Sequence, residues 1–153
     1  MILPHFDTFM DQVHERYNTL LSTAYWVANG PIPVTGGICV FSDNDIPIYV
    51  GRTRNLRRRL RQHSHKDSTQ FSASFAFLMA RRELFGPHPK KQTRHQLAIS
   101  KPFDAVFAYC RKRVGAMQVR WVEEEDPTVQ SLLEIYAAVT LGTTAHYNSF
   151  RTT

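Results

Sequence analysis

The chain has 153 residues, of which 42% are hydrophobic and 12% aromatic; this is enough to fill the core of one domain and excludes overall disorder. Nineteen Lys and Arg against thirteen Asp and Glu give a formal charge of +6, which favours a polyanionic partner such as nucleic acid over acidic small molecules. Cys39 and Cys110 lie far apart and match no metal-ligand spacing, which excludes a disulfide framework or a structural zinc and predicts reduced thiols.

No stretch approaches the roughly 18 apolar residues of a membrane helix, and the opening residues lack a signal-peptide pattern. We therefore expect a soluble, cytoplasmic protein with no membrane partner. Apolar residues at spacings of three and four predict an amphipathic helix over 6–27. The Gly- and Pro-rich segment 29–37 that follows predicts a connector.

The runs GICVFS (37–42) and IPIYVG (46–51) are rich in β-formers and flank a DND turn, so they predict a β-hairpin. Alternation places Cys39 with Phe41 on one face of its strand, and Tyr49 with Gly51 on one face of the next. A helix is predicted from Leu56, with Asn55 as its N-cap.

Arg59 and His63, four residues apart, share one stripe of that helix. Further helices are predicted over 74–84, 102–114 and 126–142, a strand over 117–125, and a basic loop over 86–92. Glu123, Glu124 and Glu125 are expected to form a solvated strand end.

Glu134 has apolar neighbours on nearly every side in the last predicted helix, so its carboxylate should be partly desolvated and should need a cation. Residue spacing alone leaves two interpretations open and favours the first: a structural ion pair with an arginine, or a metal site.

These elements resemble the GIY-YIG nuclease superfamily over about residues 36–150. The residues that carry the resemblance are GIC at 37–39, YVG at 49–51, Arg59, His63 four residues later, Glu134, and Asn148 within YNSF. Arg59 follows Gly51 by eight residues, in agreement with the family pattern. The chain departs from the family at Cys39, which replaces the first tyrosine; a small core residue is the favoured interpretation of this cysteine.

The resemblance implies an α/β (α+β) fold in which helices flank a small, mostly antiparallel three-stranded sheet. We expect a single domain over 1–153, with an N-terminal helical extension over 1–30 and a core over 36–150. A helical insertion over about 64–116 would interrupt that core.

The implied activity is a metal-dependent endonuclease that hydrolyses DNA phosphodiester bonds to 5′-phosphate and 3′-hydroxyl ends, in repair, recombination, restriction or defence. Arg59 suits the stabilisation of a charged phosphorane because its guanidinium matches phosphate oxygens and stays ionised. Glu134 would bind one Mg²⁺ or Mn²⁺. The DNA substrate is single-stranded, duplex or branched, and no small-molecule cofactor is expected.

Two roles remain open for Tyr49, a general base or a hydrogen-bond partner of Arg59 or His63. His63 is either a proton relay or a surface histidine. Arg52 is expected to contact phosphate, whereas backbone attraction is expected from Arg54, Arg57, Arg58 and Arg61. Gly37, Gly51 and Asn148 would support the site. The competing hypotheses are a catalytically degenerate nucleic-acid-binding module, supported by Cys39, and a basic scaffold domain.

Overall fold

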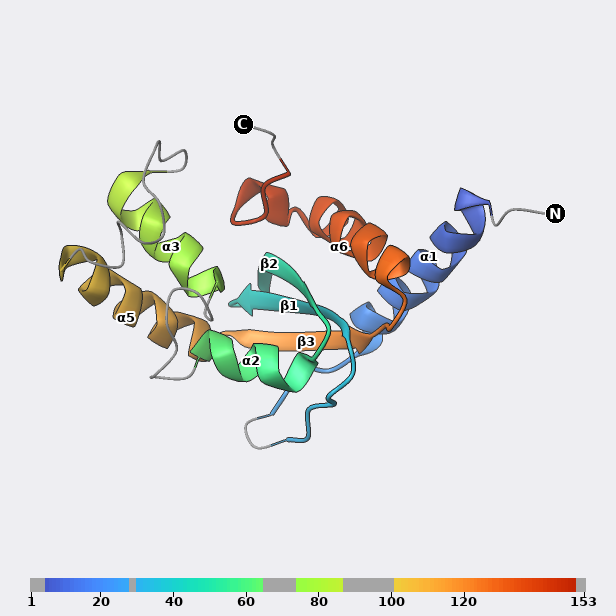
Figure 1. The fold of residues 1–153 in the computed structure, drawn as a ribbon, viewed down its shortest axis with the longest axis horizontal. Coiled ribbons are helices and arrows are strands. Elements are labelled where there is room, and N and C mark those ends of the chain that lie inside the picture. The colour runs from blue at the N-terminus through green and yellow to red at the C-terminus, as the bar shows by residue number, and fades with distance from the viewer. Residues whose placement is uncertain (1–4, 28–29, 65–73, 87–100, 151–153) are drawn as a thin grey trace. The chain divides into compact units, whose positions relative to one another are not determined.

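The computed structural model describes residues 5–27, 30–64, 74–86 and 101–150 (Figure 1). The chain forms two compact units. Unit 1 combines the residues up to Arg57 with those from Gln118 onward, and unit 2 runs from Arg58 to Met117. Within the described segments, no helix combines the length and apolar character that crossing a membrane requires.

Unit 1 is built on an antiparallel sheet of three strands, β1 (Gly37–Asp43), β2 (Ile46–Thr53) and β3 (Gln118–Glu123). Their order is β2-β1-β3, so β1 is central and β2 lies at one edge. Asn44 and Asp45 connect β1 to β2 with φ of 50° and 66°, the backbone that a tight two-residue hairpin turn requires. The predicted α+β fold with a small antiparallel sheet is therefore confirmed.

One face of this sheet carries the hydrophobic core of unit 1. Two helices, α1 (Phe6–Ser22) and α6 (Pro127–Leu141), pack against it and lie side by side in Figure 1. The core residues are Val13, Tyr17 and Leu20 of α1, Ile38, Val40, Val50 and Val122 of the sheet, and Val129, Leu133, Ala137 and Ala138 of α6. The core residues of the helices are spaced mainly by three or four, and the two of β1 by two, so each set lies on one face of its element.

The predicted helix over 6–27 is wrong at its C-terminal end. Thr23 leaves the helical region with φ −82° and ψ 131°. The Trp26 backbone N–H then donates to the Val119 carbonyl at 2.7 Å. The predicted last turn of the helix therefore does not form, and Trp26 instead makes a hydrogen bond to β3. Helical periodicity in the sequence cannot reveal such a long-range contact.

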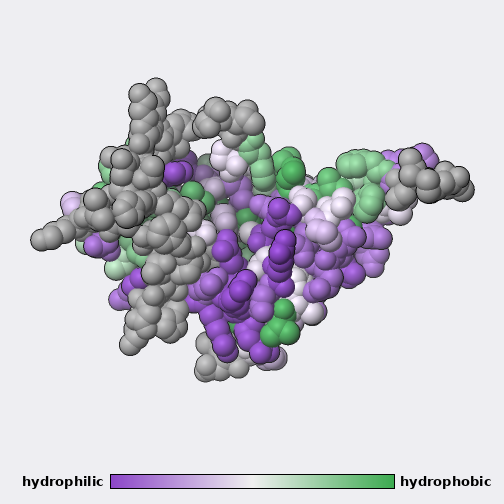
Figure 2. Space-filling model, in the orientation of Figure 1, coloured by the Kyte–Doolittle hydropathy of each residue, from purple (hydrophilic) through white to green (hydrophobic). Residues whose placement is uncertain are grey.

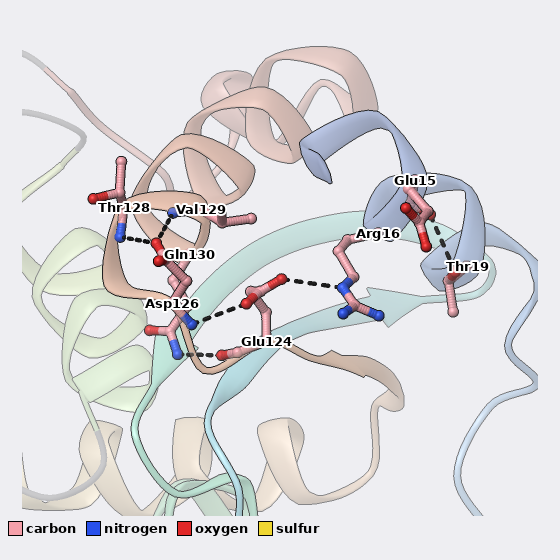
Figure 3. Close-up of polar contacts among 8 residues, drawn as sticks. All are labelled: Glu15, Arg16, Thr19, Glu124, Asp126, Thr128, Val129 and Gln130. Atoms are coloured by element: carbon pink, nitrogen blue, oxygen red, sulfur yellow. Dashed lines mark hydrogen bonds and ion pairs between the residues drawn. The ribbon is translucent and has the colours of Figure 1, made fainter. Parts of the chain in front are cut away.

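The expected solvated strand end at Glu123 to Glu125 is also wrong at Glu124, which is 9% exposed. Its Oε1 lies 3.0 Å from Arg16 Nε of α1, and its Oε2 accepts from the Asp126 backbone N–H at 2.9 Å (Figure 3). Glu124 thus joins α1 to the start of α6.

Clear start and stop signals bound α6. The Asp126 side chain accepts from the backbone N–H groups of Thr128 and Val129, as an N-cap does (Figure 3). Pro127 occupies the first turn, and Gly142 ends the helix in the left-handed region at φ 79°. The predicted helix over 126–142 is confirmed to within one residue at each end.

The helix α2 (Leu56–Ser64) begins in unit 1 and continues into unit 2. Its first backbone N–H groups, at Leu56 and Arg57, donate to the carbonyls of Thr35 and Pro33. The connector over 29–37 thereby anchors the start of the arginine-rich helix. Leu56 and Leu60 are buried, as the stripe predicted.

Unit 2 contains two further helices, α3 (Ser74–Phe85) and α5 (Lys101–Gly115), which pack against each other. Their contact includes the rings of Phe77 in α3 and Phe103 in α5, whose centroids are 5.6 Å apart. Within α5, the Phe103 ring also stacks on that of Phe107 at 5.8 Å. Both predicted helices are confirmed to within one residue at each end. The predicted basic loop over 86–92 lies, beyond Gly86, outside the described residues.

Candidate active site

Three hairpin residues of the family motif, Cys39, Tyr49 and Gly51, lie on one face of the sheet. Strand register pairs Cys39 with Gly51 and Phe41 with Tyr49, and residues paired directly across a sheet share a face. Tyr49 is 9% exposed, and its ring centroid lies 6.1 Å from that of Phe41. The Cys39 thiol is buried and donates to the Gly51 carbonyl at 3.5 Å.

Gly51 and Gly37 are positions where a side chain does not fit. A Cβ at Gly51 would lie 3.2 Å from Cε1 of Tyr49, so glycine leaves room for the tyrosine ring. A Cβ at Gly37 would lie 2.1 Å from the Val122 carbonyl oxygen, which no ordinary backbone adjustment accommodates. Both glycines therefore have a packing role beside Tyr49 and β3.

Asn148 covers the edge strand β2. Its Oδ1 accepts from the Val50 N–H at 2.7 Å, and its Nδ2 donates to the Val50 carbonyl at 2.8 Å. Both bonds are buried, and Val50 is fully buried. The amide thus pairs with the backbone of the residue that follows Tyr49, much as a neighbouring strand would.

Glu134 is 24% exposed on α6, and its Oε2 lies 3.2 Å from Nε of Arg52 at the end of β2. The same guanidinium donates from Nη1 to the Ser131 hydroxyl, one turn earlier on α6. The cation that the sequence led us to expect beside Glu134 is therefore Arg52. Ser131 was missed by sequence reasoning, although its place three residues before Glu134 on the same helix was the available signal.

An open pocket of about 590 Å³ lies next to this ion pair. It is lined by Gly36, Arg52, Thr53, Arg54, Glu125, Pro127 and Gln130. Two arginines with exposed side chains, Arg52 and Arg54, give it cationic groups, and Glu125 Oε1 accepts from the Gly36 N–H at 2.6 Å. The pocket can therefore receive an anionic group beside Glu134.

Arg59 and His63 lie on α2, in unit 2. Arg59 is half-buried, and its Nε is buried without a hydrogen-bond partner among the described residues. Buried donors without a hydrogen-bond partner are rare in folded proteins, and a bound ligand or a catalytic role is a common explanation for them. The His63 side chain lies outside the described part of the structure.

The other arginines of the motif differ in their surroundings. Arg58 and Arg61 are exposed on α2, where Figure 2 shows a concentration of hydrophilic side chains. Arg57 Nε instead donates to the Ile32 carbonyl at 2.8 Å, so this residue also holds the connector.

Within the segments that the structure describes, no three or more His, Cys, Asp and Glu side chains cluster as metal ligands. Glu134 offers one partly exposed carboxylate, a donor set that suits Mg²⁺ because this ion keeps several waters and binds substrate phosphates. An ion there must share the carboxylate with Arg52 or displace it. The residues therefore fit a weakly held ion with one protein ligand.

The small antiparallel sheet, the buried tyrosine on its hairpin and the basic helix that follows belong to an α+β fold. The family model of the GIY-YIG catalytic domain matches residues 36–126, and the chain belongs to this family. Comparisons with curated proteins and with solved structures gave no significant match. GIY-YIG domains act as endonucleases on nucleic acids and generally depend on a divalent metal.

The matched residues include the hairpin and the arginine-rich helix with Tyr49, Arg59 and His63. They end at the N-cap of α6, so Glu134 and Asn148 lie beyond them.

Proposed function

We propose that this chain is a metal-dependent endonuclease that hydrolyses DNA phosphodiester bonds and leaves 5′-phosphate and 3′-hydroxyl ends. The observation that carries the proposal is the buried Nε of Arg59, which has no hydrogen-bond partner in the described segments and belongs to the residue that resembles the family's essential arginine. A guanidinium with an unsatisfied donor is prepared to bind phosphate oxygens.

Arg59 would stabilise the transition state of hydrolysis, in which negative charge builds up on phosphorus-bound oxygens. The guanidinium stays protonated at any working pH and offers two parallel N–H donors to two oxygens. Arg54, Arg57, Arg58 and Arg61 would attract the DNA backbone without reading its sequence.

Tyr49 would accept the proton of the attacking water. Gly51 leaves room for its ring, which is buried on β2; a phenol accepts a proton only as its phenolate, and a nearby cation would favour that form. His63 would orient or relay this proton. Gly37 and Asn148 would keep the strands around Tyr49 in place.

Glu134 would hold one Mg²⁺ or Mn²⁺ ion. When bound, such an ion supplies electrostatic stabilisation of the leaving 3′ oxygen. The Arg52 guanidinium keeps the carboxylate oriented in the absence of the ion. Repair, recombination, restriction and defence are the processes in which this activity would serve.

The second candidate function is a catalytically degenerate nucleic-acid-binding module. Its support is Cys39, which is fully buried where the family has a tyrosine hydroxyl. The retention of Tyr49, Arg59 and Glu134 together favours the enzyme, because binding to a polyanion does not need a carboxylate.

The test is cleavage of single-stranded, duplex and branched DNA with Mg²⁺ or Mn²⁺. We expect Arg59→Ala to lower the rate by roughly 10² to 10³-fold, the usual effect of removing a transition-state donor. Glu134→Gln should abolish metal-dependent cleavage to a similar extent. A DNA ligase rejoins a nick only if it has a 5′-phosphate and a 3′-hydroxyl, so resealing of the product identifies these ends.

Two matched controls separate the site from general charge effects. Arg61→Ala removes an exposed arginine of the same helix, and Glu15→Gln removes an exposed carboxylate of α1. At saturating DNA, where the weaker backbone attraction expected of Arg61→Ala no longer limits the rate, both variants should retain cleavage within several-fold. Salt-sensitive DNA binding by the wild type without cleavage under any metal would establish the degenerate module instead.

A further inference from the structure

The two units differ strongly in charge. Residues 58–117, which form unit 2, contain thirteen Lys and Arg but only three Asp and Glu, a formal charge of +10. The remaining residues contain six basic and ten acidic side chains, a charge of −4, so the two values together give the +6 of the whole chain. After α2, residues 65–117 still carry ten basic and three acidic side chains. The positive charge is therefore not confined to the helix of Arg59.

Three arginines of unit 2 stack on an aromatic ring one turn earlier in their own helix. The pairs are Phe77–Arg81 in α3, and Phe107–Arg111 and Tyr109–Arg113 in α5, with 5.6, 5.3 and 5.9 Å from Cζ to the ring centroid. All three have the same i, i+4 spacing, which brings side chains together on a helix surface. The same arrangement therefore recurs in both helices.

Stacking prepares an arginine to bind phosphate. The ring contacts the flat face of the guanidinium, whereas the N–H donors lie in its plane and point past the ring edge. A side chain already held in one orientation also loses less conformational entropy when it binds.

The exposed side of α5 carries Tyr109 and Lys112, and the half-buried Arg111 and Arg113 flank it. Phe103, Phe107, Cys110 and Val114 form its buried stripe, which leaves Tyr109, 59% exposed, and Lys112 on the outside. Arg113 is 35% exposed, and its Nη1 lies 3.7 Å from Oε1 of the half-exposed Glu83. Such a solvated ion pair is weak and does not prevent a phosphate from binding.

We propose that unit 2 holds the nucleic acid, and that the outer face of α5 contacts its phosphates through Arg111, Lys112 and Arg113. The inference rests on the proposed function for the class of substrate. It assigns affinity mainly to the helical insertion, whereas Tyr49 and Glu134, which belong to the proposed chemistry, lie in the acidic unit 1.

The test measures binding of fluorescently labelled single-stranded and duplex DNA to the full chain, in EDTA so that no cleavage occurs. Lys112→Gln with Arg113→Gln should weaken binding about tenfold near physiological salt. Between about 50 and 200 mM salt it should also reduce the slope of log affinity against log salt by about 1.5 to 2, as expected for two lost phosphate contacts. Tyr109→Leu keeps the charge but removes the stacked ring, and should weaken binding about threefold.

The matched control is Gln12→Glu with Asn18→Asp, which lowers the net charge by the same two units on the exposed surface of α1. Equal weakening by both double variants would show that only net charge matters and would overturn the proposal, as would unchanged binding by the α5 variant. Thermal unfolding confirms that each variant is folded.

The outcomes of the two proposals can be told apart. If the wild type cleaves DNA but the α5 variant binds normally, only this inference fails. If the α5 variant loses binding and no cleavage occurs, only the nuclease proposal fails.

Discussion

Arg52 is the residue whose role the structure changes most. Sequence reasoning expected it to contact phosphate, whereas its guanidinium holds Oε2 of Glu134 at 3.2 Å and also binds Ser131. A cation at this distance opposes the binding of a second cation to the same carboxylate. A metal ion at Glu134 would therefore have to compete with Arg52 for the carboxylate.

Replacing Arg52 should strengthen metal binding. We expect Arg52→Gln to lower the Mn²⁺ concentration for half-saturation about threefold to tenfold, because a partly exposed ion pair contributes on the order of 1 kcal/mol. Electron paramagnetic resonance of Mn²⁺ without DNA measures this binding apart from any effect on substrate. Arg54→Gln, which removes another exposed arginine of the same pocket, should leave the midpoint near that of the wild type. A midpoint that stays the same or rises in Arg52→Gln would show that the guanidinium does not compete with the ion.

At the scale of elements, the hairpin β1–β2 depends on contacts far away in the sequence. Its edge strand would expose the backbone N–H and carbonyl of Val50 if Asn148 did not pair with both. Because Val50 lies directly after Tyr49, this pairing also determines how firmly the tyrosine is held. The contact between Asn148 and Val50 therefore supports both the hairpin and the position of Tyr49, the candidate base.

Asn148→Ala should lower the free energy of unfolding by about 2 to 4 kcal/mol, since it leaves two buried backbone groups without partners. Urea unfolding followed by circular dichroism measures the change. Ser149→Ala, at the exposed neighbouring position, should change stability by less than about 0.5 kcal/mol. Equal stability of the two variants would indicate that water replaces the amide at the edge of β2.

At the scale of the whole molecule, each unit contains a buried ionisable group that should make the folded state less stable at alkaline pH. Burial raises the pKa of the Cys110 thiol in unit 2 from 9.0 to about 11. Burial also raises the pKa of the Tyr17 phenol in unit 1. Each group is therefore harder to ionise in the folded chain than in the unfolded chain.

Stability should consequently fall as the pH rises from 9 towards 11. Below pH 9 the thiol is protonated in both states; between the two pKa values the unfolded chain loses this proton while the folded chain keeps it, which favours unfolding. Urea midpoints measured across this range should decrease, and less steeply in Cys110→Ala than in the wild type. The same slope in both proteins would show that this thiol does not contribute.

Local patterns in the sequence were sufficient for most elements of the fold. Runs rich in β-forming residues on both sides of the DND turn predicted the hairpin, and Pro127 with Gly142 bounded α6, because turns and helix ends depend on residues close together in the chain. The same patterns overextended α1, since the bond from Trp26 to Val119 is a long-range contact. The expectation for Glu124 failed for the same reason, because its partner Arg16 lies 108 residues away.

What the sequence by itself determined is the family and the identity of the candidate residues: the spacing of Gly37, Tyr49, Gly51, Arg59 and His63 is a property of the chain alone. Only the tertiary structure decided that Arg52 pairs with Glu134, which backbone groups Asn148 satisfies, and that the Nε of Arg59 is buried without a partner among the described residues. These features depend on distances between residues separated by many positions, and such distances are set by packing across the sheet rather than by local preference.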